Sequence, residues 1–231
     1  MRVTVLELPA TWGHPARVLE GVERAIGTGP ATDVVVLPEQ SLSGYLSRHG
    51  ELDLAPFAED IDGPTARRCV AIAKSHGVHL FAPLVLRESD ALYNAMVCYR
   101  PEGVYFIYRK RHPWIPEEWA TAGAKPLPIA EIAGKKVTVA VCYDVHFLAE
   151  ESAAELRHAD VLMFPSAWVE QPDNRAKHLS AIAKDFDLDV VNANWGPGEV
   201  VVPGQGNSVV IGRDGALIAR APLLGRIDVE L

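Results

Sequence analysis

Three residue types that together can attack a carbonyl group each follow an apolar, strand-like run in this sequence. Cys142 follows Val137–Val141, Glu39 follows Val34–Leu37 and a proline, and Lys110 ends the run 104–109. A cysteine thiolate is a strong nucleophile, a carboxylate can exchange protons with it, and an ammonium can stabilise a developing oxyanion. Each residue also has an ordinary structural interpretation: a buried small cysteine, a surface or helix-start carboxylate, and a solvated lysine at a strand end.

Other chemistries have weaker support in the sequence. No Gly-x-Ser-x-Gly elbow is present, which disfavours a serine hydrolase. His112, His146 and His178 have no accompanying HExxH or Cys-x-x-Cys motif, so we expect no metal site. The glycines at 196–198 and 204–206 complete no phosphate-binding fingerprint, and we therefore expect no nucleotide cofactor.

The elements that must position these residues are short runs rich in Val and Ile, separated by Gly and Pro and alternating with amphipathic segments. We predict strands at 2–8, 33–37, 78–86, 91–100, 104–109, 136–141, 160–164, 189–193, 208–211 and 226–229. We predict helices at 15–26, 64–76, 147–158 and 173–187. A hairpin at 91–109 implies a mixed sheet, and the whole pattern predicts a layered α/β protein that forms a single domain over 1–231.

Four of the predicted strands lead into reactive or aromatic clusters, which are Pro-Glu-Gln-Ser (38–41), Cys-Tyr-Asp (142–144), Pro-Ser-Ala-Trp (165–168) and Asn-Ala-Asn-Trp (192–195). In α/β sheets, ligands bind beyond the carboxyl ends of the strands. If these strands are parallel neighbours, the four clusters converge on one crevice.

Composition restricts the class of protein. The 231 residues carry 22 Lys and Arg against 30 Asp and Glu, a formal net charge of -8, so we expect no nucleic-acid partner. No apolar run approaches the roughly 18 residues of a membrane helix, and the N-terminus lacks a signal-peptide core, so we expect no membrane association. The three cysteines, Cys69, Cys98 and Cys142, are too few for a disulfide scaffold, which is typical of a reduced, cytoplasmic protein.

Four motifs occur in an order and spacing that resemble the nitrilase, or carbon–nitrogen hydrolase, superfamily. They are Leu-Pro-Glu-x-x-x-x-Gly-Tyr (37–45), Tyr-Arg-Lys-x-His (108–112), Val-Cys-Tyr-Asp (141–144) and Phe-Pro-Ser-Ala-Trp (164–168). Each motif alone is weak, but the four together span most of the chain, and the segments 192–194, 206–208 and 214–215 also match later landmarks of the family.

The resemblance implies a four-layer αββα sandwich that is usually extended into a homodimer or a higher homo-oligomer. It implies a catalytic triad of Glu39, Lys110 and Cys142, with the backbone N–H of Tyr143 as a second oxyanion donor. Many members carry another glutamate after the lysine motif. Its spacing points to Glu117, which would orient Lys110 or the substrate, and the adjacent Glu118 is the competing choice.

The sequence departs from the family pattern in three places. Val145-His146-Phe147 follows the nucleophile motif where many members have Arg-Phe-Pro, Pro113-Trp114 follows the lysine motif where a leucine is usual, and Ile182–Phe186 replaces the common Arg-Ala-x-Glu-Asn segment. None of these differences removes a triad residue.

The nucleophile motif Cys-Tyr-Asp resembles the amidase and carbamoylase branches more than true nitrilases, which tend to carry Cys-Trp-Glu. The resemblance implies hydrolysis of a small linear amide by water, giving a carboxylate and ammonia through a thioester. Alternatives are an N-carbamoyl amine or amino acid amidohydrolase, a nitrilase, an acyltransferase with an amine acceptor, and a catalytically silent subunit.

Candidate substrate-binding residues are aromatic or lie beside the triad. Tyr45, Trp114, Trp168 and Trp195 could form pocket walls or pack in the core. Asp144 either binds the substrate or caps the helix that follows it.

Overall fold

Two six-stranded mixed sheets form the centre of the computed structural model, which describes all 231 residues. The first sheet has the order β12 (Arg226–Glu230), β1 (Arg2–Leu6), β2 (Val34–Val36), β3 (His79–Glu88), β4 (Ala91–Arg100) and β5 (Gly103–Arg109). The second sheet has the order β11 (Leu217–Arg220), β10 (Val209–Ile211), β9 (Asp189–Asn194), β8 (Val161–Ser166), β7 (Lys135–Val139) and β6 (Ala130–Ile132).

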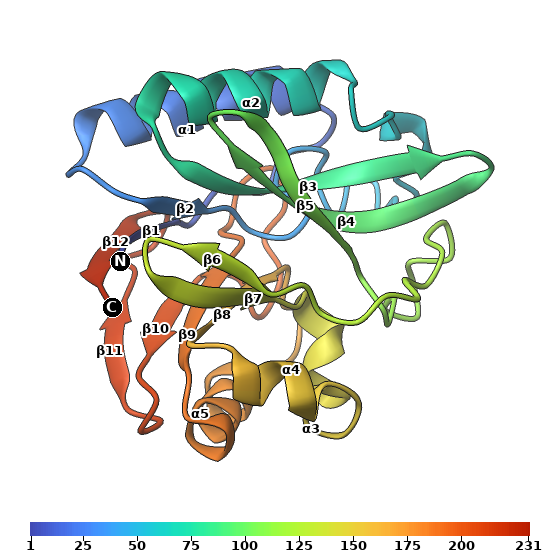
Figure 1. Cartoon of the computed structure of the whole chain (residues 1–231). Coiled ribbons are helices and arrows are strands. Elements are labelled where there is room, and N and C mark those ends of the chain that lie inside the picture. Colours follow the sequence, from blue (N-terminus) through green and yellow to red (C-terminus); the bar gives the residue numbers. More distant parts are fainter.

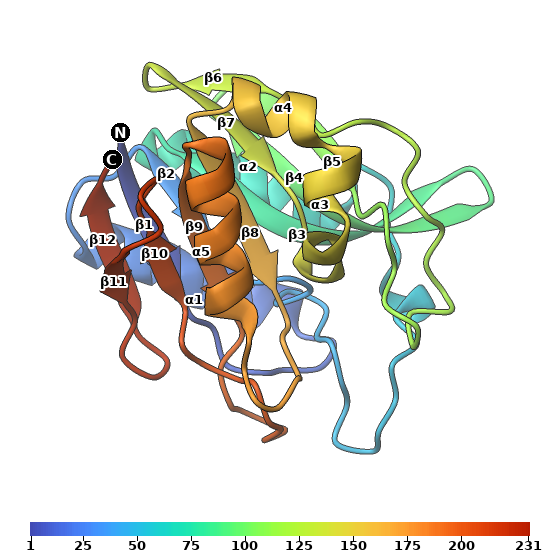
Figure 2. The ribbon, with the colours of Figure 1, turned by 90° about the horizontal axis from the view of Figure 1, so that it is seen from below.

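Helices cover the outer face of each sheet. α1 (Pro15–Thr28) and α2 (Pro64–His76) lie side by side on the first sheet, whereas α3 (Leu148–Glu151), α4 (Ala153–His158) and α5 (Arg175–Phe186) lie on the second, as Figures 1 and 2 show. Two short 3-10 helices, η1 (Ala55–Phe57) and η2 (Cys142–His146), sit in the connections. This arrangement is the predicted αββα sandwich. No helix combines the length and apolar character that crossing a bilayer requires.

The helix boundaries follow from the sequence. α1 and α2 both begin at a proline, whose fixed φ suits the first helical position. α2 ends at Gly77, which adopts a left-handed conformation with φ of 65°. α1 turns Leu19, Val22 and Ile26 toward the sheet, a helical spacing that gives one apolar face.

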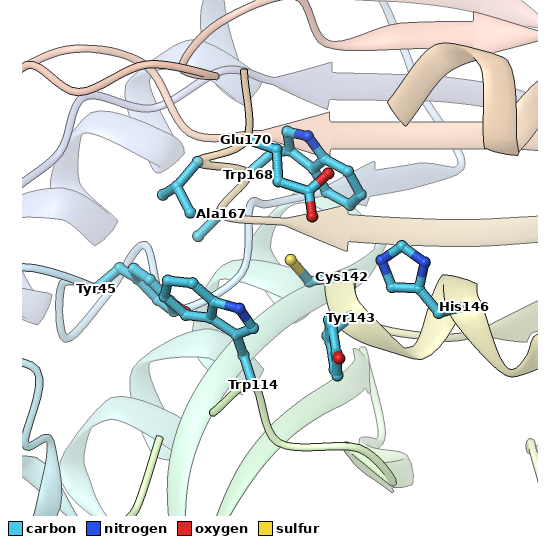
Figure 3. A pocket seen from close by; sticks show the side chains of 9 residues that line it. Tyr45, Trp114, Cys142, Tyr143, His146, Ala167, Trp168 and Glu170 are labelled. Carbon is cyan, nitrogen blue, oxygen red and sulfur yellow. The ribbon is translucent and has the colours of Figure 1, made fainter. Parts of the chain in front are cut away.

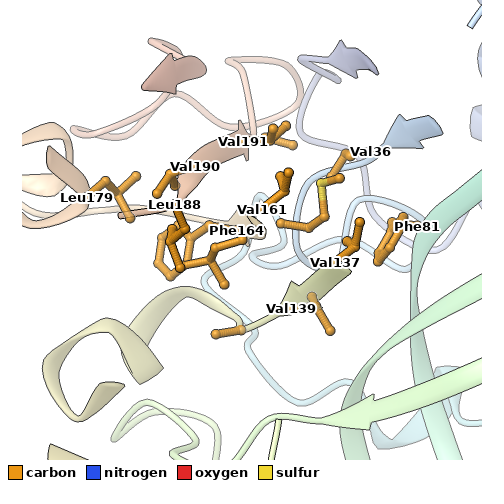
Figure 4. Close-up of a cluster of buried hydrophobic side chains, with 14 of the residues drawn as sticks. Val36, Phe81, Val137, Val139, Val161, Phe164, Leu179, Leu188, Val190 and Val191 are labelled. Atoms are coloured by element: carbon orange, nitrogen blue, oxygen red, sulfur yellow. The ribbon is translucent and has the colours of Figure 1, made fainter. Parts of the chain in front are cut away.

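The main hydrophobic core lies between the two sheets. Val36 and Phe81 of the first sheet pack in one buried cluster with Val137, Val139 and Val161 of the second (Figure 4). A second cluster fills the layer between the first sheet and its helices α1 and α2. The inner core therefore fixes the position of each sheet relative to the other.

The strand directions bring the carboxyl ends of several strands to shared edges. β2 is parallel to β3, and β5 runs in the same direction because two antiparallel pairings separate it from β3. In the second sheet, β7, β8 and β9 are parallel neighbours. The segments that carry Glu39, Lys110 and Cys142 all follow such carboxyl ends.

Two details differ from the sequence prediction. The helix predicted at 147–158 is broken at Ser152, which has φ of -132° and whose buried hydroxyl accepts a hydrogen bond from the Arg111 guanidinium. Because this contact joins distant segments, the spacing of apolar residues in 147–158 does not indicate the break. Strands β6 and β11 were not predicted, because β6 has three residues and β11 is an edge strand without a buried, alternating face.

Truncation of Phe164 tests the main hydrophobic cluster. Phe164 is fully buried in this cluster, on the face of β8 opposite to Val161 and Met163, so Phe164→Ala leaves a cavity and should lower the free energy of unfolding by about 3–5 kcal/mol. Urea denaturation followed by circular dichroism measures this loss. Val201→Ala is the control, since Val201 is 80% exposed and its truncation should change stability by less than about 0.5 kcal/mol. Equal stability of the two variants would contradict the assignment of the core.

Candidate active site

A buried lysine joins two buried glutamates at the end of the first sheet. Lys110 directly follows β5, and its Nζ donates to Glu39 Oε1 at 2.7 Å and to Glu117 Oε1 at 2.8 Å. All three side chains are almost completely removed from solvent. Since an isolated charge is costly to bury, the two carboxylates compensate the ammonium in this position.

The position of the second glutamate follows from the loop after β5. Glu117 is buried, and its N–H donates to the carbonyl of Trp114 at 2.7 Å while its Oε2 accepts from the N–H of Trp114 at 3.3 Å. Glu118 is exposed. Glu117, rather than Glu118, therefore contacts Lys110.

Asn94, which the sequence analysis did not single out, links the two glutamates. Its amide donates to Glu39 Oε1 at 2.8 Å and to Glu117 Oε2 at 3.4 Å, and its carbonyl oxygen accepts from Gln40 at 2.7 Å. The sequence offered one indication of its role, because Asn94 is a polar residue inside the largely apolar strand β4. Tyr45 also donates from its hydroxyl to Glu117 at 3.2 Å.

Glu39 accepts hydrogen bonds on both of its oxygens. Lys110 and Asn94 donate to Oε1, and the backbone N–H of Ala167, just beyond β8, donates to Oε2 at 2.9 Å. An ionised carboxylate is an acceptor only, which matches three donors and no acceptor around this group. The bond from Ala167 also connects the first sheet to the second at the site.

Cys142 lies on a strained turn after β7. Its φ is 48°, a left-handed conformation that is unusual for a residue other than glycine, and it starts η2. Burial raises the pKa of the Cys142 thiol well above its ordinary value, and the charge of Glu39 raises it further, while Lys110 opposes the change. The resting residue is therefore a thiol that needs a base to become a nucleophile.

Lys110 and the two glutamates shift one another's pKa values. Burial alone would lower the pKa of Lys110, but the charges of Glu39 and Glu117 outweigh it and raise that pKa above its ordinary value. Burial raises the pKa of Glu117, and the charge of Glu39 adds to this, while Lys110 opposes it. Lys110 is thus held as an ammonium throughout the neutral range.

Asp144 holds the nucleophile turn rather than facing the pocket. Its carboxylate accepts from Tyr108 Oη at 2.8 Å, from Val141 N at 3.0 Å and from His112 N at 2.9 Å. The bond from the N–H of Val141, the residue before η2, closes the first turn of η2, and the other two tie the turn to the lysine segment. Asp144 does not line the pocket, and it does not cap the helix that follows, because α3 begins after Phe147 without a side-chain cap.

A small pocket opens above Cys142, and Figure 3 shows its sulfur facing this space. The space between its side chains is about 290 Å³, including the part open to solvent. It is lined by Tyr45, Trp114, Cys142, Tyr143, His146, Ala167, Trp168, Val169 and Glu170. Three of the four predicted aromatic walls, Tyr45, Trp114 and Trp168, therefore line one pocket.

Trp195 is the predicted wall that does not line this pocket. It packs edge-on against Tyr45 with ring centroids 5.6 Å apart, and its Nε1 donates to the carbonyl of Trp168 at 3.0 Å. It therefore supports two wall residues from behind. His146 and Glu170, in contrast, line the pocket and were not among the predicted substrate-binding residues.

The arrangement can perform one kind of chemistry well. It places a thiol beside a carboxylate that accepts protons, and both beside an ammonium that can compensate negative charge on a bound oxygen. The pocket walls are largely apolar and aromatic, which limits competition from bulk water.

Comparison with known proteins gives a consistent result. The family model described as carbon–nitrogen hydrolase matches residues 3–226. The hydrolase in the pqqF 5′ region of Pseudomonas protegens is 29% identical across 100% of this chain and 84% of its own length. The (R)-stereoselective amidase of a Pseudomonas species is 26% identical across 100% of this chain and 83% of its own length.

Solved structures share the fold. A carbon–nitrogen hydrolase superfamily protein from Xanthomonas campestris superposes with a TM-score of 0.85 at 22% identity, over 99% of this chain and 89% of that protein. An amidase from Nesterenkonia sp. AN1 gives a TM-score of 0.85 at 24% identity, over 100% and 92% of the two chains. At these identities the likeness concerns the fold.

Replacement of Asp144 tests its role in the turn. Asp144→Asn keeps the size of the side chain but loses the charged acceptor for Tyr108 and Val141, so it should lower the free energy of unfolding by about 2 kcal/mol. Urea denaturation measures the change. Asp90→Asn, at an exposed turn, is the matched control and should have little effect. An Asp144 variant as stable as the control would rule out this role.

The pH dependence of stability tests the contact between His112 and Asp144. The hydrogen bond that His112 Nδ1 donates to Asp144 raises the pKa of His112 above its ordinary value, while partial burial opposes this. A group with a raised folded-state pKa stabilises the fold fully below its unfolded pKa, about 6.5 for histidine, and this stabilisation disappears as pH rises through the folded pKa.

The stability difference between the wild type and His112→Gln should therefore be larger at pH 5.5 than at pH 9. Urea denaturation of both proteins at the two pH values measures it. A difference that grows with pH would contradict the predicted direction.

Proposed function

The chain belongs to the carbon–nitrogen hydrolase family, and we propose that it hydrolyses a small linear amide to a carboxylate and ammonia, with Cys142 as the nucleophile. The observation that carries this proposal is the buried ion cluster of Lys110 with Glu39 and Glu117, whose charges act on the Cys142 thiol and which Tyr45, another lining residue of the pocket, contacts through Glu117. A protein that only binds ligands has no physical need to bury these charges beside a strained cysteine.

In the first step, Glu39 takes the proton of the Cys142 thiol as the sulfur attacks the amide carbon. The raised pKa of this thiol makes such a base necessary at neutral pH. The negative charge that develops on the carbonyl oxygen is stabilised by the Lys110 ammonium and by the N–H of Tyr143. That N–H lies in the first turn of η2, where helical N–H groups have no partner within the helix.

In the second step, the carbon–nitrogen bond breaks and Glu39 gives its proton to the leaving nitrogen, which departs as ammonia. A thioester between the acyl group and Cys142 remains. Glu39 then takes a proton from water as the water oxygen attacks the thioester carbon. The carbon–sulfur bond breaks, Glu39 returns this proton to the sulfur, and the acid product gives its own proton to the ammonia or to solvent and leaves as a carboxylate. Glu117 and Asn94 act as positioning residues, because they hold Lys110 and Glu39.

Amides are the preferred substrate class for two reasons. The relatives include the (R)-stereoselective amidase and an omega-amidase of Escherichia coli, and in one structure of the Nesterenkonia amidase acrylamide has added to the active-site cysteine. The small pocket of this chain fits a short acyl chain better than a bulky one. N-carbamoyl compounds and nitriles also contain an electrophilic carbon bonded to nitrogen, and the experiment below includes both classes.

Ammonia release from small amides, ureido compounds and nitriles tests the proposal. The wild type should release ammonia from amides, and Cys142→Ala should release none above background. Lys110→Met removes one oxyanion donor and should lower kcat by at least about a hundredfold. Cys69→Ala is the control, because Cys69 is buried in α2, away from the pocket, and this variant should keep its activity.

Three outcomes would contradict the proposal. Ammonia release that persists in Cys142→Ala would exclude the thiol mechanism. Release from ureido compounds or nitriles in preference to amides would assign a different substrate class. A wild type that acts on no compound, with a Cys142 thiol inert to iodoacetamide near pH 7, would indicate a silent fold.

A further inference from the structure

The pocket above Cys142 contains an acidic side chain that the proposed reaction does not use. Of its nine lining residues, Glu170 is the one Asp or Glu, and none is Arg or Lys. Figure 3 shows the Glu170 carboxylate above the pocket, pointing toward the space that Cys142 and His146 border. Glu170 is exposed and belongs to none of the ion pairs of the chain, so its charge is available to a ligand.

No residue in the lining of this pocket is Arg or Lys, so none supplies a permanent positive charge to compensate Glu170. His146 is the nearest candidate, but partial burial and the neighbouring His178 lower its pKa and outweigh the opposing charge of Glu170, so its ring is neutral near pH 7. The ring of His146 lies between those of Trp168 and His178, with centroids 6.2 and 5.4 Å away. The lining of the pocket is therefore acidic, with Glu170 as its one Asp or Glu and with no Arg or Lys.

We propose that Glu170 is a specificity-determining residue, which selects amides whose far end carries a primary ammonium or another cationic group and disfavours amides whose far end carries a carboxylate. This inference rests on the proposed amide hydrolysis and names its substrate class. The aromatic walls formed by Trp114 and Trp168 support it, because cations are also favoured near the faces of aromatic rings.

Three amides of matched length test the preference: 3-aminopropanamide, butanamide and succinamate. Each has the amide on a two-carbon spacer, and the far end is positive, neutral or negative. The wild type should show a kcat/KM for 3-aminopropanamide about fivefold above that for butanamide, the effect of one partly solvated charge pair, and should be slowest on succinamate. The advantage should lie in KM and should shrink at 0.5 M salt, because salt screens exposed charges.

Glu170→Gln removes the charge and keeps the shape of the side chain. In this variant the three kcat/KM values should converge, and the salt dependence of their ratio should disappear. Glu150→Gln is the matched control, since Glu150 is an exposed residue of α3 outside the pocket, and it should keep the wild-type preference.

The results separate this inference from the proposed function. Hydrolysis of all three amides at equal kcat/KM, a preference for succinamate, or an unchanged ratio in Glu170→Gln would overturn the role of Glu170 and leave amide hydrolysis standing. If the wild type hydrolyses none of the three, amide hydrolysis fails for this class. The binding of the three amides is then ranked by how strongly each slows the alkylation of Cys142 by iodoacetamide. Only stronger protection by 3-aminopropanamide than by the other two, with this advantage lost in Glu170→Gln, would support Glu170 as a specificity-determining residue.

Discussion

The rest of the site depends on one buried ammonium between two buried carboxylates. Desolvating these three charges costs several kcal/mol for each ion, and only mutual contact at 2.7 and 2.8 Å, with further donors on the carboxylates, offsets that cost. Lys110 must therefore stay where both glutamates reach it. This requirement fixes the ends of β2 and β5 and the loop that carries Glu117, and it explains why Asn94 and Tyr45 point polar atoms into the same place.

The sandwich brings a second set of strand ends against this cluster. The inner core sets the distance between the sheets, and the hydrogen bond from Ala167 to Glu39 joins them at the reactive edge. Asp144 adds another link, because it holds the strained turn of Cys142 to Tyr108 and His112 on the lysine segment. The strain at Cys142 persists because its surroundings fix the turn on both sides, as is common for residues held ready for chemistry.

The strand and helix layers and the family could be predicted from the sequence, because Pro and Gly punctuation and apolar periodicity are local signals. The order of four motifs also indicated Glu39, Lys110 and Cys142, which the structure brings to one place. The spacing alone did not decide whether Glu117 or Glu118 is the second glutamate of the site, because the two adjacent residues differ in burial and hardly in their distance along the chain. Asn94, the broken helix at Ser152 and the lining residues His146 and Glu170 depend on contacts between distant segments, which a single sequence does not display.

The account depends most on a covalent acyl group at Cys142. Its direct test is to mix the wild type with a hydrolysed amide, quench in acid within the first turnover, and measure both ammonia and the mass of the intact protein. The account predicts a burst of about one ammonia per site and an equal fraction of protein heavier by the acyl group, located on the peptide that contains Cys142. A burst of ammonia with no added mass, or with the acyl group on another residue, would contradict it.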